Sequence, residues 1–273
     1  MGRAALRPAL SIADGAGRFL AFGFEALVWI PFALKHYRRQ MLESIRSVAW
    51  GRGNLIADGG VLSVLAILGA AIGIGAAIEG LAALDVLGLG SLAGVIGGMA
   101  LVRELGPILA GIGFAAQAGC RMTAEIGAMR LGEEVDACES LSVRPIPFIV
   151  STRVFAGLVC MVPGYLIALV AGMEGTRIIA TSVFSIPGGT YQHYFGQFVT
   201  VPDLALSTVK AVVFCLVVTL IHCYCGFFAT GGPEGVGIAT GNAVRASLVA
   251  IVSLDFLLTV IMWGAIPQLE FVG

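Results

Sequence analysis

Residues 103–146 read RELGPILAGIGFAAQAGCRMTAEIGAMRLGEEVDACESLSVRPI, and this stretch decides how the chain folds. It opens with an Arg-Glu pair and a Gly-Pro step, and residues 105–120 carry no charge. Beyond them the sequence becomes charged, while small and apolar residues recur at helical spacing and would share one face. These residues are Ala124, Ala128, Leu131, Val135 and Cys138. The pattern predicts a membrane helix that leads into a helix outside the bilayer, at about 121–142, which Pro145 and Pro147 end.

The composition is that of an all-α integral membrane protein. Of the 273 residues, 58% are hydrophobic and only 12% are charged, which excludes a soluble domain with an ordinary surface. The 38 glycines suit membrane helices that pack closely through small residues. Five of the six cysteines lie in or beside apolar stretches, so we expect no disulfide framework.

Five apolar runs approach or exceed the roughly 20 residues that span a bilayer. The predicted spans are 59–78, 86–120, 154–173, 211–233 and 246–269, with 174–203 as the largest loop. The second would be about 52 Å long as one helix, so we expect a break at Gly106-Pro107. A separate re-entrant segment over 86–102 is the alternative. Gly69 and Gly73 lie about one turn apart and could form a packing face.

The N-terminal apolar run, residues 19–34, is short for a span and contains Glu25 and Pro31. A basic cluster follows it, so we expect a helix that lies in the membrane interface, with a short span as the alternative. Thirteen Lys and Arg residues fall on the side that holds the N-terminus and the charged helix. The positive-inside rule therefore predicts that the N-terminus is cytoplasmic.

Motifs in three places carry a resemblance to a known family. RELGP (103–107), AEIGAMRLGEEVDA (124–137) with the following Pro-Ile, and GGPEGVGIAT (231–240) resemble the signature of MlaE/YrbE-like permeases. These are the membrane subunits of MCE-linked lipid ABC transporters. The resemblance covers residue 55 to the C-terminus, and it leaves 1–54 as a cytoplasmic or interfacial segment. The chain departs from the family pattern at Gln117, where Arg is expected, and at Cys138, Ser142 and Arg144, where Leu, Gly and Asp are more usual.

The resemblance implies a permease subunit in a bacterial inner (plasma) membrane, working in ATP-driven lipid transport. The implied partners are a cytoplasmic ABC ATPase dimer, which would bind ATP and Mg, and extracytoplasmic MCE proteins. A phospholipid, fatty acid, mycolate-like acid or sterol would fit as cargo, and we expect import. The four departures favour a heterodimer with a second YrbE-like permease, in contact through faces such as Gly69 and Gly73, over a homodimer.

Two groups of residues are the candidate sites. Arg103, Glu104 and Asp255 are charges in apolar sequence, where an unpaired charge is costly, and we predict that they line the lipid pathway. Arg103 and Glu104 could instead form a structural pair, and Asp255 could pair with a neighbouring helix. The resemblance assigns the charged helix to contact with the ATPase. We expect its coupling residues to be Glu125, Arg130, Glu133 and Asp136.

Other kinds of function have weaker support in the sequence. The chain contains no GxxxxGK[ST] motif, so ATP hydrolysis would belong to a partner and this chain would be no enzyme. A secondary transporter would favour internal repeats, and we find no convincing one. A membrane-embedded lipid enzyme using His222 or His193 would lack a partnered nucleophile. The His-Cys-Tyr-Cys run at 222–225 does not match zinc spacing, so we expect no metal and no cofactor in this chain.

Overall fold

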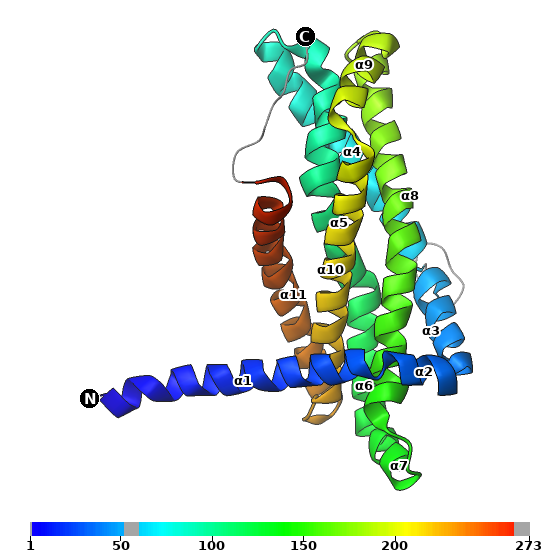
Figure 1. Ribbon diagram of the computed structural model, residues 1–273, viewed down its shortest axis with the longest axis vertical. Helices are drawn as coiled ribbons and strands as arrows, with labels where there is room; N and C mark the ends of the chain where they lie inside the picture. Colours follow the sequence, from blue (N-terminus) through cyan, green and yellow to red (C-terminus); the bar gives the residue numbers. More distant parts are fainter. Residues whose placement is uncertain (1, 52–59, 265–273) are drawn as a thin grey trace.

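The structure, a computed structural model, describes residues 2–51 and 60–264. The helices are α1 (Gly2–Val28), α2 (Ile30–His36), α3 (Arg38–Trp50), α4 (Val61–Val86), η1 (Gly90–Ala93), η2 (Ile96–Leu105), α5 (Gly106–Phe114), η3 (Ala115–Gly119), α6 (Cys120–Leu131), α7 (Glu134–Ser140), η4 (Ile146–Ser151), α8 (Thr152–Ser182), α9 (Gly188–Phe198), α10 (Val201–Phe227) and α11 (Gly232–Trp263). No strand occurs in these two ranges, and the long helices run up and down as one bundle (Figure 1). The predicted all-α membrane fold is confirmed.

Five helices of the described chain are long and apolar enough to cross a membrane, as predicted. They are Val61–Val86, Ile96–Leu131, Ile146–Ser182, Val201–Phe227 and Gly232–Trp263. Most extend further than their apolar runs, because helical hydrogen bonding continues into polar sequence. The predicted loop at 174–203 is therefore largely helical, as the end of α8, α9 and the start of α10. The predicted start at 59 and end at 269 lie outside the described residues.

The second span is one helix of 36 residues, Ile96–Leu131, and it is not broken at Gly106-Pro107. Gly106 keeps helical backbone angles (φ −59°, ψ −58°), and its N–H donates to the carbonyl of Leu101. This i→i+5 bond belongs to a π-helical turn, which widens the helix where the Pro107 ring would clash with the preceding turn. Residues before Ile96 form the turn that follows α4, so 86–102 is no separate segment.

The backbones of α4 and α8 approach closely through glycines. A Cβ atom on Gly69 would lie 2.2 Å from the Ala168 carbonyl oxygen, and one on Gly73 would lie 2.0 Å from that of Gly172. Only glycine allows this approach, and such contacts hold membrane helices together by packing. The prediction that Gly69 and Gly73 contact a second permease is therefore wrong, because both already pack inside this chain.

Helix α1 lies across the bundle, nearly perpendicular to the long helices (Figure 1). Its Phe22 is buried and packs edge-on against Tyr224 of α10, whereas Leu20 and Phe24 on the opposite face are exposed. A helix that lies across the spans and keeps an apolar outer face suits the membrane interface. This orientation favours the interfacial helix over the short-span alternative.

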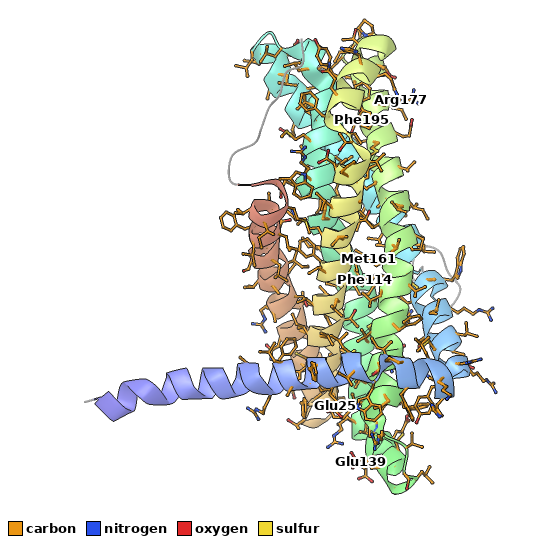
Figure 2. All side chains as sticks on the ribbon, in the orientation of Figure 1. Glu25, Phe114, Glu139, Met161, Arg177 and Phe195 are labelled. Carbon is orange, nitrogen blue, oxygen red and sulfur yellow. The ribbon has the colours of Figure 1, made fainter. Side chains whose placement is uncertain are left out.

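The N-terminal segment and the charged helix lie at the same end of the bundle, as the count of Lys and Arg residues predicts. Helices α1–α3, α6 and α7 gather at one end, and α9 lies at the other (Figure 1). Figure 2 shows Glu139 at the first end, Arg177 at the second, and Phe114 and Met161 in the core between them. The two basic segments of the sequence therefore share one end of the molecule.

Candidate functional site

Lys210 lies at the centre of a charged cluster inside the bundle. Its side chain comes from α10 and is fully buried. The Lys210 Nζ lies 2.6 Å from an Asp255 carboxylate oxygen and 3.2 Å from one of Glu104. It also donates to the Thr259 hydroxyl at 2.7 Å and to the Arg103 carbonyl at 2.9 Å. The lysine therefore ties η2, α10 and α11 together, and its two carboxylates offset the cost of burying the charge.

A second ion pair lies beside the first. Arg103 Nη2 is 3.1 Å from Asp203 Oδ1, and the same oxygen accepts a hydrogen bond of 2.7 Å from the Trp263 indole. Asp203 belongs to a capping box, in which the Thr200 hydroxyl accepts from the Asp203 backbone and donates to its carboxylate. The N-terminus of α10 thus fixes the carboxylate that holds Arg103.

This geometry corrects the predicted pairing of Arg103 with Glu104. Adjacent residues of a helix do not face each other, so Arg103 turns to Asp203 while Glu104 turns to Lys210. Asp255 pairs with the neighbouring helix α10, which is one of the two interpretations that the sequence left open. Lys210 falls just outside the predicted span at 211–233, and the structure buries it.

An apolar cavity of about 340 Å³ opens beside the cluster. Val95, Ile96, Met99 and Ala100 form its apolar wall, and its polar lining consists of Arg103, Glu104, Thr259 and Trp263. The Arg103 Nε is buried and has no hydrogen-bond partner within the described residues. The Arg103 side chain as a whole is 22% exposed, so the structure places a partly exposed guanidinium at the edge of an apolar space, which suits an amphiphile with an anionic or polar head.

The predicted coupling helix is two helices. Gly132 and Glu133 separate α6 from α7, and Glu133 adopts left-handed backbone angles (φ 57°, ψ 15°), which end the first helix. The Arg130 guanidinium lies 2.6 Å from the Asp136 carboxylate across this turn. Arg130, Glu133 and Asp136 therefore meet at one exposed corner, whereas α6 itself continues the second span.

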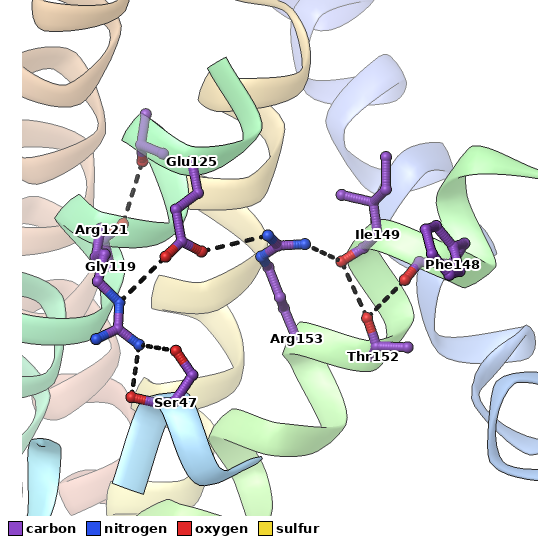
Figure 3. A network of polar contacts seen from close by, with 9 residues as sticks. Ser47, Gly119, Arg121, Glu125, Phe148, Ile149, Thr152 and Arg153 are labelled. Atoms are coloured by element: carbon purple, nitrogen blue, oxygen red, sulfur yellow. Dashed lines mark hydrogen bonds and ion pairs between the residues drawn. The ribbon is translucent and has the colours of Figure 1, made fainter. Parts of the chain in front are cut away.

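Glu125 lies away from that corner, in a polar network between three helices (Figure 3). Its carboxylate is 3.5 Å from the Arg121 guanidinium and 3.3 Å from that of Arg153 in α8. Arg121 also donates to the backbone carbonyl and the hydroxyl of Ser47 in α3, both at 2.6 Å. The four predicted coupling residues thus divide into an exposed group of three and this half-buried junction.

The histidine-cysteine run is packed between helices. His222 is buried, and its Nδ1 lies 2.8 Å from the Thr123 hydroxyl of α6. The described part of the chain contains no group of three His, Cys, Asp or Glu residues that could hold a metal ion.

Sequence reasoning missed Lys210, Asp203, Thr259 and Trp263. Lys210 is a lone charge where an apolar run begins, and this is the one signal in the sequence that could have marked it as buried. Asp203 stands at the end of the predicted loop, and Thr259 and Trp263 are uncharged residues inside the last apolar run, so nothing in the sequence singles them out. Their relation to Arg103 and Glu104 depends on how α10 and α11 pack.

Comparison with known proteins gives one family. The family model described as Permease MlaE matches residues 56–261. The intermembrane phospholipid transport system permease protein MlaE of Haemophilus influenzae is 30% identical over 209 residues, which are 76% of this chain and 80% of that protein. A probable ABC transporter permease protein of Rickettsia typhi is 34% identical over 165 residues, 60% of this chain and 64% of the relative.

A plant protein also matches. The chloroplastic protein TRIGALACTOSYLDIACYLGLYCEROL 1 of Arabidopsis thaliana is 30% identical over 173 residues, 63% of this chain and 49% of that protein. The chain spans just under two thirds of the length of the rickettsial relative and about half that of the plant relative. The family model covers most of the chain, including all five spans nearly to their ends, and so the chain belongs to the MlaE permease family.

Proposed function

We propose that this chain is the permease subunit of an ATP-driven lipid transporter and that its cargo is a phospholipid. The observation that carries the proposal is the apolar cavity of about 340 Å³ with Arg103 at its edge. A guanidinium matches a phosphate group in geometry and charge, and the apolar wall suits acyl chains. The name of the Haemophilus relative, a phospholipid transport permease, supports this choice of cargo.

The second span provides a mechanical link between the cavity and the partner ATPase. Arg103 and Glu104 lie near one end of Ile96–Leu131, and Arg130 lies at the other, about 40 Å away along the helix axis. A push on α6 and α7 would therefore be transmitted along one continuous helix to the residues that face the lipid. The buried partners of Glu104 on α10 and α11 would have to rearrange when this helix moves.

The partners follow from the family. An ABC ATPase dimer would bind ATP and Mg at the cytoplasmic side and press on the α6–α7 corner, and MCE proteins would receive or deliver lipid outside. We propose an inner-membrane location, a cytoplasmic N-terminus and import. The departures at Gln117, Cys138, Ser142 and Arg144 support a heterodimer with a second permease that keeps the usual residues.

Purification of the tagged chain from its native membrane tests the proposal. We expect an ATPase and a second permease to co-purify, and mass spectrometry of the intact complex should show the two permease masses in equal amounts. Phospholipid should stimulate ATP hydrolysis by the complex. A complex without an ATPase would overturn the transporter assignment, and two copies of this chain alone would replace the heterodimer with a homodimer.

A further inference from the structure

A second, larger cavity lies at the opposite end of the bundle, between α3, α6 and α8. Its volume is about 580 Å³, within the range of ligand pockets. Three guanidiniums line it: Arg46 from α3, Arg121 from α6 and Arg153 from α8. The transport proposal makes no use of this cavity.

Two of the cations form the floor and are held in place. The side chains of Arg121 and Arg153 are 23% and 12% exposed, and the Glu125 carboxylate lies between them (Figure 3). Each guanidinium has five N–H donors, and the contacts described above occupy only some of them. The Glu125 carboxylate supplies one negative charge to two positive ones, so the floor keeps an excess of positive charge.

The mouth adds a third cation. Arg46 is exposed, and the structure shows no ion pair or hydrogen bond from its side chain to any described residue. Glu43 also lines the cavity, but its carboxylate is engaged by the Arg39 guanidinium at 3.1 Å, and the lining still holds three arginines against two glutamates. Val48 of α3 and Met122 and Met129 of α6 give the lining its large apolar side chains, and Gln40, Ser44 and Ser47 of α3 add uncharged polar ones. An excess of guanidinium beside an apolar wall suits a phosphate that is attached to an apolar chain.

The position of the cavity agrees with this chemistry. Helix α3 lies beside the end of α8, next to the crossing helices α1 and α2 (Figure 1). Helices of this kind lie at the level of the lipid headgroups, and basic pockets between membrane helices at that level bind anionic headgroups. We propose that this cavity binds the phosphate headgroup of an anionic phospholipid in the adjacent leaflet, as a site separate from the transport cavity. The proposal stands whether or not the cargo is a phospholipid.

Photolabelling in vesicles provides a test that is specific to this site. The full chain, with its co-purified subunits, is placed in phosphatidylcholine vesicles that contain a trace of phosphatidylglycerol with a photoreactive headgroup. Peptide mapping should find label on 40–51 and 121–129. We expect Arg46→Ala to lower this labelling about fivefold, the effect of one basic side chain near an anionic lipid. Arg38→Ala, on the same helix, exposed and outside the lining, is the matched control and should change nothing.

A second pair of variants tests the cavity without changing any charge. Ala128 is exposed and lines the cavity, so Ala128→Phe should fill it and lower the labelling, whereas Ala124→Phe, one turn away and outside the lining, should not. Thermal unfolding midpoints equal to that of the wild type would show that both variants fold. Labelling that falls equally in Arg38→Ala, or persists in Ala128→Phe, would mean attraction to a charged surface and would overturn the site. Competition by glycerol 3-phosphate as strong as that by unlabelled phosphatidylglycerol would show a site for free phosphate esters and would overturn the lipid assignment.

Discussion

The Lys210 ammonium lies 2.6 Å from the Asp255 carboxylate, and this contact joins two spans that share no other ion pair among the described residues. Glu104 brings a third span to the same ammonium. Arg103 and Asp203 form a second ion pair directly beside this cluster. The charged groups inside the bundle therefore form a network of side chains from three helices, and mutation can test each ion pair separately.

Lys210→Met should destabilise the chain severely. The change keeps the length of the side chain but leaves Glu104 and Asp255 close together without a cation. Loss of one partner from a buried pair costs about 3–5 kcal/mol. We expect a clearly lower thermal unfolding midpoint in detergent and a lower yield of folded protein.

A neutral triple variant separates folding from transport. Lys210→Met with Glu104→Gln and Asp255→Asn removes all three charges, so it should recover most of the lost thermal stability. Lys35→Met, at an exposed position, is the control for loss of a lysine. A Lys210→Met chain as stable as the wild type would show that the buried ammonium does not hold the three helices together.

The Arg103–Asp203 pair can be tested by exchange. Arg103→Ala should abolish lipid transport if the guanidinium binds the headgroup, because the cavity lining then contains no cation. Exchanging the two residues, Arg103→Asp with Asp203→Arg, would restore a structural pair but not the headgroup contact. We therefore expect the exchanged chain to fold and still fail in a lipid transfer assay. Recovered transfer would assign the pair a structural role.

The sequence predicted the number of spans well, because each apolar run is long enough to cross a bilayer and charged or turn-forming residues separate the runs. It predicted helix ends poorly. Hydropathy marks only the part of a helix that lies in lipid, and α8 continues past Glu174 to Ser182, where Thr176 and Ala180 are buried against neighbouring helices. It singled out Arg103, Glu104 and Asp255, which contact Lys210 in the structure, but it could not give their partners. Lys210 and Asp203 meet them only through the way α10 packs against η2 and α11.

Topology can be checked by labelling single cysteines. Cys120, Cys138 and Cys225 are replaced, and the three buried cysteines, Cys160, Cys215 and Cys223, are kept. Cysteine introduced at the exposed position Gln192 in α9 should react with an impermeant maleimide added outside intact cells. Cysteine at Glu134 in α7 should react only after the membrane is opened. Reaction of both from the same side would contradict a bundle that crosses the membrane from α7 to α9.

The α6–α7 corner should be needed for coupling. Glu133→Lys with Asp136→Lys reverses two exposed charges and removes the ion pair with Arg130, which as a surface pair contributes only about 0–1 kcal/mol to stability. We expect the chain to fold normally and lipid-stimulated ATP hydrolysis in the complex to disappear, while the separate ATPase keeps its basal rate. Unchanged stimulation would leave this corner as a solvated surface.

Glu125 should affect coupling by holding α6 in position, without contacting the ATPase. Glu125→Gln keeps the size of the side chain but removes the charge that Arg121 and Arg153 share, so α6 is held less firmly against α3 and α8. We expect ATPase binding to remain, because the exposed corner is intact, while lipid-stimulated hydrolysis falls several-fold. Glu139→Gln, on α7 and exposed, is the matched control and should keep full stimulation. Glu125→Asp, which keeps the charge, should recover part of the lost stimulation. If Glu125→Gln instead abolished ATPase binding, the residue would belong to the contact surface, as the sequence first indicated, and the junction between three helices would have no part in transmitting the motion.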